Sequence, residues 1–227
     1  MTFSKVEAAL QAMRAGEFVV VADDAARENE GDLIIAAEKV TAKALAFMLR
    51  HTSGVVCVAV TEARAQALEL PLMVPQNSES QGTAFTVSVD FRQGTTTGIS
   101  AADRSAAIRG LADPRVGPAA FLRPGHVFPL KARPGGVLER RGHTEAAVDL
   151  ALLSGLAPAG ALCELVDEEG EMLRGRDLER FAHHHQLPFL HIDQLVRYRR
   201  LLERTPVVLA HRPAREISDA CHEGALG

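Results

Sequence analysis

The stretch FVVVADDAARENEGDLII, residues 18–35, places an acidic segment between two strongly apolar runs. Residues 18–22 and 33–37 are apolar enough to predict two buried strands. Between them, Arg27-Glu28-Asn29-Glu30-Gly31-Asp32 brings three carboxylates and one guanidinium within six residues. Alternate residues of an extended segment share a face, so we expect these three carboxylates to converge on one side.

Three carboxylates that converge repel one another unless a cation lies among them. Hard divalent cations such as Mg²⁺ take oxygen ligands of this kind. The competing interpretation is a solvated acidic loop, and the charge cluster alone favours that interpretation. The rest of the chain therefore has to decide between a metal site and a surface loop.

Helical and strand patterns alternate along the whole chain. Further strands are predicted at residues 55–60, 84–90, 126–132 and 161–166 and near Phe189, and helices at residues 4–15, 41–50, 62–70, 100–111, 144–154, 177–186 and 193–204. Ser4, Thr41, Ser100 and Thr144 are the expected helix caps. The alternation predicts an α/β (α+β layered) fold, a three-layer α/β/α arrangement with a mixed, largely buried sheet.

The expected domain organisation is a single domain over residues 1–204 and a loosely attached C-terminal tail over residues 205–227. No linker or composition break divides the first part, and no internal repeat is found in it. The tail mixes Pro, His, Asp, Glu and Gly with a single apolar patch at residues 207–210. We therefore expect the tail to contribute little to the core.

Composition excludes several classes of function. Hydrophobic residues make up 47% of the 227-residue chain, as in an ordinary globular protein. The net charge of −4 argues against a nucleic-acid binder, and one Tyr with no Trp gives no platform for stacking bases. No apolar run approaches the length of a membrane span.

The three cysteines, Cys57, Cys163 and Cys221, are far apart and contain no C-x-x-C pair. An odd number of distant cysteines indicates a reducing compartment and not a disulfide framework. The N-terminal residues 1–7 lack the apolar segment of a signal peptide. We therefore expect a cytoplasmic location.

Residues 140–145 combine several groups at the expected start of a helix. The exposed N–H groups of a helix start form a site for anions, and Arg140 adds a bidentate donor for phosphate. His143 is placed to ligate a metal or to move a proton. A His at a helix start is nevertheless more often part of a satisfied cap.

Two residues in predicted strands are also candidates for chemistry. Glu164 falls inside the apolar run at residues 161–166, where a carboxylate is costly unless it is paired, metal-bound or protonated. Glu164 is therefore a candidate acid/base group, unless its strand lies at an edge and the side chain faces water. His126, between glycine and an apolar run, has the alternative of being a hydrogen-bonded core residue.

Five segments occur in an order that resembles a known family. They are Asp23-Asp24 with residues 27–32 (RENEGD), residues 96–104 (TTGISAADR), 123–130 (RPGHVFPL), 142–146 (GHTEA) and 162–164 (LCE). Together they resemble the 3,4-dihydroxy-2-butanone 4-phosphate synthases of riboflavin biosynthesis, over roughly residues 5–204. Five segments in register are far more specific than any single motif.

The resemblance implies an enzyme that converts D-ribulose 5-phosphate to 3,4-dihydroxy-2-butanone 4-phosphate and formate. It implies Mg²⁺ or Mn²⁺, two ions per site, no organic cofactor, and a homodimer with active sites at the interface. By motif, the metal ligands are Glu28 and His143, the catalytic residues His126 and Glu164, the substrate-binding residues Arg27, Glu28, Asp32, Arg140, Arg141, Gly142, His143, Thr144 and Glu164, and the supporting residues Asp23 and Glu30. Arg141 departs from some relatives, in which a small residue is frequent at this position, and this leaves the local shape of the loop open.

The alternative function is a non-catalytic sugar-phosphate or nucleotide-binding module on a similar α/β fold. Such a module explains Arg140 and Thr144 but leaves a buried Glu164 and the acidic cluster without a role. Relatives are often fused to a GTP cyclohydrolase domain that binds zinc through three cysteines. Only 23 residues with one cysteine, Cys221, follow Arg204, so we expect the synthase reaction alone.

Overall fold

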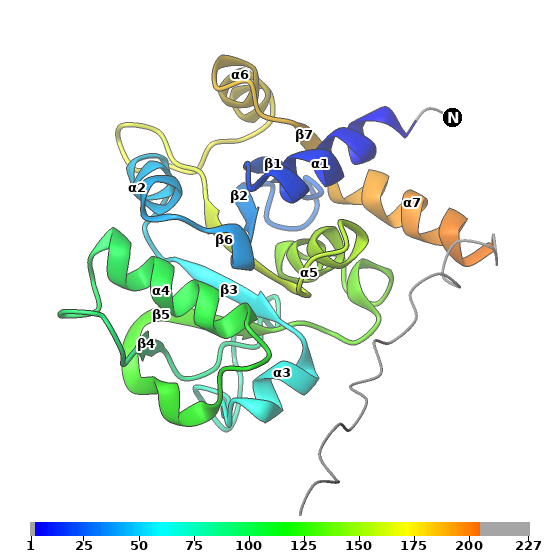
Figure 1. The fold of residues 1–227 in the computed structure, drawn as a ribbon. Helices are drawn as coiled ribbons and strands as arrows, with labels where there is room; N and C mark the ends of the chain where they lie inside the picture. Colours follow the sequence, from blue (N-terminus) through cyan, green and yellow to red (C-terminus); the bar gives the residue numbers. More distant parts are fainter. Residues whose placement is uncertain (1–2, 205–227) are drawn as a thin grey trace, which may run out of the picture.

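A computed structural model of the protein describes residues 3–204, which form one mixed sheet with helices on both faces (Figure 1). The strands are β1 (Val19–Ala22), β2 (Gly31–Ala36), β3 (Cys57–Val60), β4 (Val89–Phe91), β5 (Phe121–Lys131), β6 (Ala159–Glu164) and β7 (Phe189–His191). The helices are α1 (Ser4–Ala15), α2 (Ala42–His51), α3 (Glu62–Ala67), α4 (Ala101–Ala112), α5 (His143–Leu153), α6 (Arg176–His184) and α7 (Ile192–Arg204).

The seven strands lie in the order β4-β5-β3-β6-β2-β1-β7. The pairs β3–β5 and β1–β7 are parallel, and the other neighbours are antiparallel. The antiparallel pairing of β2 with β6 places Asp32 directly opposite Glu164. Two carboxylates distant in sequence therefore meet at one end of the central strands.

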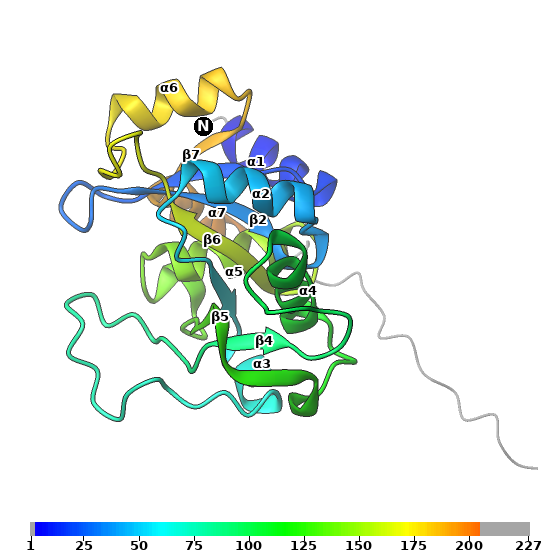
Figure 2. The same cartoon turned by 90° about the vertical axis from the view of Figure 1, so that its left-hand side faces the viewer.

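Two separate cores cover the two faces of the sheet. In β1 and β2, Val20 and Leu33 point into the core shared with α2, α3, α4 and α6, whereas Val21 and Ile34 point into the core shared with α1, α5 and α7. Successive side chains of a strand point to opposite faces, so continuous apolar runs mark strands buried on both sides. Figures 1 and 2 show the same three layers, which confirms the predicted architecture.

Helix ends agree with the sequence at some caps and differ at others. The Thr41 hydroxyl accepts the N–H of Ala44, and the Ser100 hydroxyl accepts the N–H of Asp103, as capping predicts. The predicted caps Ser4 and Thr144 are wrong. Both residues lie inside the first turn of their helices, since α1 begins after Phe3 and α5 begins after Gly142.

Two strand predictions also need correction. Of residues 84–90, only the end belongs to a strand, β4, and it is Thr86 and Ser88 that are buried, while Phe85 and Val87 are half-buried. β5 begins at Phe121, five residues earlier than the expected start at His126. The predicted tail at residues 205–227 lies outside the described residues, and the domain boundary at residue 204 stays a prediction.

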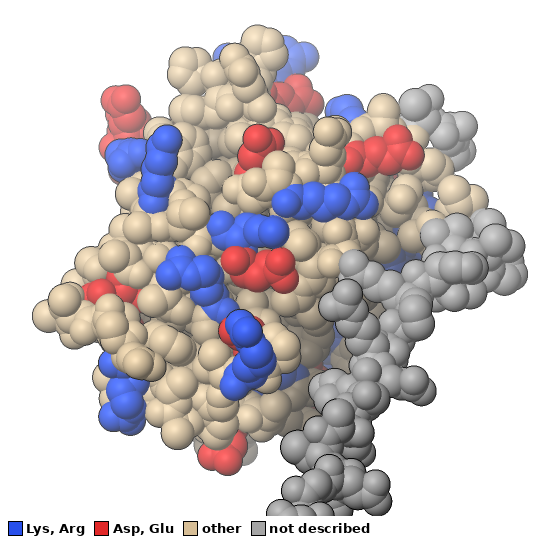
Figure 3. Space-filling model, viewed as in Figure 1, with Lys and Arg blue, Asp and Glu red and all other residues tan. Residues whose placement is uncertain are grey.

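The surface carries mixed charge. On the face seen in Figure 3, Lys and Arg side chains lie beside Asp and Glu side chains and do not form one continuous basic surface. Among the helices of residues 3–204, none combines the length and the apolar character that a bilayer crossing requires.

Gly160 lets α5 pack directly against β6. A Cβ at this position would lie 2.9 Å from the Cβ and 3.0 Å from the carbonyl oxygen of Ala147. We expect Gly160→Ala to lower stability by about 1–3 kcal/mol, the usual cost of overpacking. The melting temperature should then fall by roughly 2–10 °C.

Gly117→Ala is the matched control, because nothing lies within 4 Å of its added Cβ. Differential scanning calorimetry of the two variants measures the difference. Equal melting temperatures would show that α5 can move away from the sheet at no cost.

Candidate active site

Asp23 folds the loop between β1 and β2. Its buried carboxylate accepts the backbone N–H groups of Glu28 (3.1 Å) and Glu30 (2.9 Å) and a side-chain N–H of Arg27 (3.0 Å). Asn29 has a positive φ of 56°, a conformation in which Asn is enriched among non-glycine residues. Residues 23–30 are therefore a folded loop, and the expectation of one extended segment is wrong.

The first residue of α5, His143, reaches the acidic loop. Its Nε2 lies 3.1 Å from the carbonyl oxygen of Val21, and its Nδ1 lies 3.7 Å from Glu28 Oε2 and 3.6 Å from Asp32 Oδ1. A carbonyl oxygen only accepts, so Nε2 carries the hydrogen and Nδ1 faces the two carboxylates. Glu28, Asp32 and His143 thus form one cluster at the end of the sheet.

The cluster and its surroundings contain more carboxylates than positively charged groups, and this excess of negative charge shifts the pKa values of its members. Burial raises the pKa of Asp32 to about 7, and the charges of Glu164, Glu28 and Glu30 act in the same direction. Burial alone would lower the pKa of His143, but the nearby carboxylates of Asp32, Glu28 and Asp23 raise it to about 9. The adjacent His143 imidazole lowers the pKa of Glu28. A positive charge among these carboxylates is therefore strongly stabilised.

The donor set of the cluster fits a hard divalent cation. Ligand atoms of Asp23, Glu28 and His143 lie within 4.8 Å of one another. Asp32 Oδ1 is buried and has no hydrogen-bond partner within the described residues, although a buried carboxylate oxygen normally has one. Asp23 already accepts three hydrogen bonds, so Glu28 and His143 are the members best placed to bind an ion, with Asp23 in support.

A cavity of about 240 Å³ opens beside the cluster and collects most of the predicted residues. Glu28, Glu30, Asp32, His143, Thr144 and Glu164 all line it, as does Arg27. It is also lined by Cys57, Glu79, Thr83 and Phe85, which the sequence did not indicate as site residues. From the sequence, Cys57 is a core residue in an apolar strand and Phe85 belongs to the predicted strand of residues 84–90, whereas Glu79 and Thr83 lie in a polar loop whose place in the fold no local pattern reveals.

The sequence model of the 3,4-dihydroxy-2-butanone 4-phosphate synthase family matches residues 7–198. The chain belongs to this family. The 3,4-dihydroxy-2-butanone 4-phosphate synthase of Pelobacter propionicus is 49% identical, over 97% of this chain and 94% of that protein. The riboflavin biosynthesis protein RibBA of Salinispora arenicola is 56% identical over 92% of this chain, which spans only 50% of that longer protein.

Solved structures of synthases from this family have the same fold. One crystallised with two magnesium ions is 47% identical, superposes with a TM-score of 0.83, and is matched over 97% of its length and 88% of this chain. The Candida albicans synthase is 52% identical with a TM-score of 0.80, covering 85% of this chain and 96% of its own.

Arg140 ties the loop of residues 76–84 to the start of α5. Its guanidinium donates to Glu145 Oε2 (2.7 Å), to Thr83 Oγ1 (2.9 Å) and to the carbonyl oxygen of Gln81 (3.2 Å). Its Nε also donates to the carbonyl oxygen of Gln81 (3.4 Å), so four of its five N–H groups are engaged with described residues and the second hydrogen of Nη1 is available for a phosphate. Arg140 controls a wall of the cavity, since Glu79 and Thr83 belong to the loop that it holds.

We expect Arg140→Lys to loosen the loop in the free protein. A single ammonium group cannot reach Glu145, Thr83 and Gln81 together, and each lost hydrogen bond removes about 0.5–1.5 kcal/mol. Amide hydrogen exchange at residues 79–83 should become roughly 5- to 30-fold faster. Arg133→Lys is the control, because Arg133 contacts Glu145 through its backbone N–H, which that substitution keeps. Unchanged exchange would show that the loop holds its shape without the Arg140 fork.

The neighbours of Arg140 take different positions. Arg141 points away from the cavity toward α7, where its guanidinium lies 3.9 Å from Asp193 and its side chain is 56% exposed. Gly142 is the residue before α5, and Thr144 lines the cavity from inside the first turn. Arg27 is held by Asp23 and Glu28 at the rim.

Glu164 is the last residue of β6, a central strand, and is half-buried. The Ser53 hydroxyl donates to Glu164 Oε2 (2.7 Å), and the Ser53 N–H donates to the Glu164 carbonyl oxygen (2.9 Å). The carboxylate is therefore partnered at one oxygen. Ser53 was not indicated by the sequence, because it is separated from Glu164 by 111 residues.

His126 does not line the cavity of its own chain. It lies in β5 with a side chain that is 43% exposed, and its Nδ1 is 2.8 Å from Asp90 Oδ2. The alternative of a buried core histidine is therefore wrong. The structure brings together every other predicted catalytic or metal-binding residue but leaves His126 outside.

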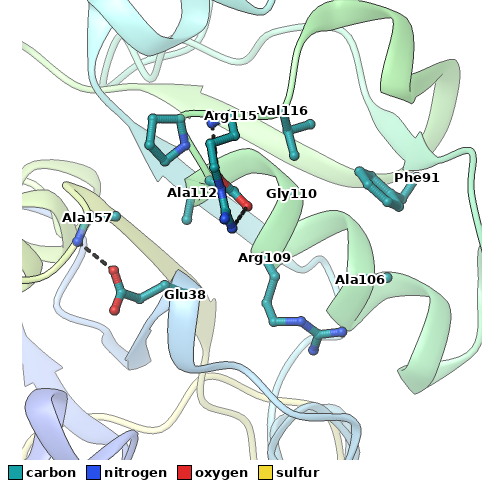
Figure 4. Close-up of a pocket in the computed structure, with 11 residues that line it drawn as sticks. Glu38, Phe91, Ala106, Arg109, Gly110, Ala112, Arg115, Val116 and Ala157 are labelled. Atoms are coloured by element: carbon teal, nitrogen blue, oxygen red, sulfur yellow. Dashed lines mark hydrogen bonds and ion pairs between the residues drawn. The ribbon is translucent and has the colours of Figure 1, made fainter. Parts of the chain in front are cut away.

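A larger cavity of about 560 Å³ lies between α4 and the segment that follows it (Figure 4). Its charged groups are already engaged. Glu38 accepts the N–H of Ala157, Arg109 donates to the carbonyl oxygen of Val40, and Asp113 pairs with Arg115. The smaller cavity, with its excess of carboxylates, is therefore the better candidate for chemistry.

Proposed function

We propose that this chain converts D-ribulose 5-phosphate to 3,4-dihydroxy-2-butanone 4-phosphate and formate, a reaction of riboflavin biosynthesis. The carbon count balances, since a five-carbon sugar phosphate gives a four-carbon product and a one-carbon acid. The observation that carries the proposal is the cluster of Glu28, Asp32 and His143 in one cavity with Glu164. Membership of the synthase family supports it.

Each group of the cavity has a task in such a reaction. A divalent cation held by Glu28 and His143 would supply positive charge where negative charge develops on the oxygens of the sugar. Mg²⁺ is the expected ion, with Mn²⁺ as an alternative, since a relative was crystallised with two magnesium ions. Asp32, which lines the cavity and has a buried carboxylate oxygen without a partner among the described residues, binds a substrate hydroxyl.

Glu164 is the proposed group for proton transfer, with Ser53 fixing one of its oxygens. The N–H groups at the start of α5, together with Thr144, suit the phosphate, and Arg140 adds the N–H group that its protein partners leave open. Glu30 and Asp23 shape the rim. No organic cofactor is required for any of these steps.

The rival function, a binding module without catalysis, fits this site less well. Burial raises the pKa of Glu30, with the charges of Glu28 and Glu164 acting in the same direction. The neutral hydroxyls of a bound sugar do not compensate the negative charge of these carboxylates. Formate release from ribulose 5-phosphate, measured after chelation and again after addition of Mg²⁺, separates the two functions. A chain that binds the substrate but releases no formate in Mg²⁺ is the rival module.

We also infer that the active enzyme is a homodimer in which His126 completes the site of the partner. The exposure of His126 and its position outside the cavity of its own chain support this arrangement. In a dimer with twofold symmetry, each subunit would contribute its His126 to the site of the other.

Mixed dimers test this arrangement. Glu28→Gln and His126→Ala chains are each expected to be inactive, but a heterodimer of the two contains one site with both residues intact. Random exchange of equal amounts should restore about a quarter of wild-type activity, since half of the dimers are mixed and each has one working site. Absence of any recovery after refolding the chains together would show that each site is complete within one chain.

A cytoplasmic location remains a proposal. Cys57 and Cys163 are both free thiols in the described part of the chain, which agrees with a reducing compartment.

A further inference from the structure

His126 is carried by a bulge in β5. Val89 of β4 pairs with Val127, but the next residue, Asp90, pairs with Leu122, so residues 123–126 have no partner on β4. Bulges next to active sites re-aim a side chain, and this one turns His126 outward. The bulge presses closely on β4, because a Cβ at Gly125 would lie 2.0 Å from the carbonyl carbon of Val89.

Asp90 holds His126 with both carboxylate oxygens. Oδ1 accepts the backbone N–H of His126 (2.9 Å), and Oδ2 lies 2.8 Å from His126 Nδ1. An ionised carboxylate only accepts, so Nδ1 carries a hydrogen and Nε2 is the nitrogen left for chemistry. Only 11% of the Asp90 side chain is exposed, so it contacts solvent far less than the imidazole does.

The segment of residues 94–104 braces Asp90 from behind. Asp103 accepts the N–H of Thr96 (3.1 Å), its hydroxyl (2.7 Å) and the N–H of Gly98 (3.0 Å), which fixes the turn that precedes α4. Gly98, at a φ of +90°, lies so close to Asp90 that an added Cβ would be 2.2 Å from Oδ2. The turn therefore packs against the carboxylate that contacts His126, and a side chain at residue 98 would displace it.

We propose that Asp90 is the positioning residue of His126, and that residues 94–104 exist in this form to keep Asp90 in place. The inference rests on the proposed function through the catalytic role of His126, and its test by subunit mixing rests also on the proposed dimer. It gives a function to the hydroxyl-rich turn of residues 94–98 and to Asp103, which take no part in the proposed metal or substrate sites. Asp90 fixes both the direction of the imidazole and the ring nitrogen that bears the hydrogen.

Asp90→Asn is the decisive variant. The amide has one accepting oxygen, which the backbone N–H of His126 requires, so its NH₂ group must face Nδ1 and donate to it. The proton of the neutral imidazole then moves to Nε2, which is the reverse tautomer. We expect kcat to fall about 100-fold, the scale of a misplaced acid/base group, while KM and Mn²⁺ affinity change less than about threefold.

Two readouts distinguish positioning from a merely structural role. The ¹⁵N shifts of the His126 imidazole, assigned with a His126→Gln sample, should report the reversed tautomer in Asp90→Asn. Asp90→Asn chains should regain activity when mixed with Glu28→Gln chains but none when mixed with His126→Ala chains, because Asp90 and His126 serve the same site. The NMR readout stands even if wild-type enzyme releases no formate, an outcome that would overturn the proposed function alone.

Gly98→Ala provides a second variant that leaves Asp90 unchanged. Its added methyl group displaces the carboxylate, so kcat should again fall with little change in KM. Gly94→Ala is the matched control, since its φ of +73° imposes the same backbone strain but nothing lies within 4 Å of its Cβ. A wild-type tautomer in Asp90→Asn, or a kcat within threefold of wild type in both Asp90→Asn and Gly98→Ala, would overturn the proposal.

Discussion

Replacing Glu28 with glutamine is expected to abolish formate release while the fold survives. The substitution keeps the size of the side chain and removes the charge that faces His143 Nδ1 and Arg27. Loss of a metal ligand removes several kcal/mol of charge stabilisation, so the rate should fall by about 10³-fold or more. Mn²⁺ binding, followed by electron paramagnetic resonance, should weaken in parallel.

The fold should tolerate this change because Glu28 is half-buried at the rim of the cavity and its backbone N–H still donates to Asp23. Glu62→Gln is the matched control. Glu62 is a partly exposed carboxylate paired with Lys131 outside the cavity, and such pairs contribute about 0–1 kcal/mol. A Glu28→Gln enzyme that released formate at a rate near that of Glu62→Gln would refute the metal assignment.

The parts of the fold that follow from local chemistry could be predicted. The apolar runs on both sides of the acidic loop are β1 and β2, and the hydroxyls of Thr41 and Ser100 cap the helices that follow them. Alternation failed at residues 84–90, because Thr86 is buried through hydrogen bonds to the carbonyl oxygen of Pro129, a partner 43 residues away. Period-two patterns report burial and not the identity of the partner.

The residues of the candidate site also fall into those that local sequence motifs predict and those that depend on contacts between distant segments. Residues that lie within a motif, such as Glu28 and His143, could be predicted to lie in one site because the motif itself names them, and the structure places both at one cavity. Ser53 and Asp90 could not, because each acts on a residue brought near only by pairing of distant strands. The hydrogen bonds of Arg140 to Gln81 and Thr83 could not be predicted either, because the contacts of a loop do not follow from any periodic sequence pattern.

Glu164 could be predicted only in part. Its position in an apolar strand marks it as unusual in the sequence, but its partner Ser53 is known only from the fold. Glu164→Gln should fold, because the new amide oxygen can still accept the Ser53 hydroxyl. It should also bind ribulose 5-phosphate, since the groups proposed for the phosphate lie at the start of α5. We expect kcat to fall about 10²- to 10⁴-fold, the range for a lost acid/base group.

Binding and turnover of this variant must be measured separately. Isothermal titration with ribulose 5-phosphate gives the affinity, and formate release gives kcat, with Glu168→Gln on the exposed turn after β6 as the control. If affinity and kcat/KM fell in equal proportion with kcat unchanged, Glu164 would be a binding group and not a proton carrier. Retained affinity with lost turnover would instead place the proton transfer at the oxygen that Ser53 leaves open, because the other oxygen is already occupied by the hydroxyl.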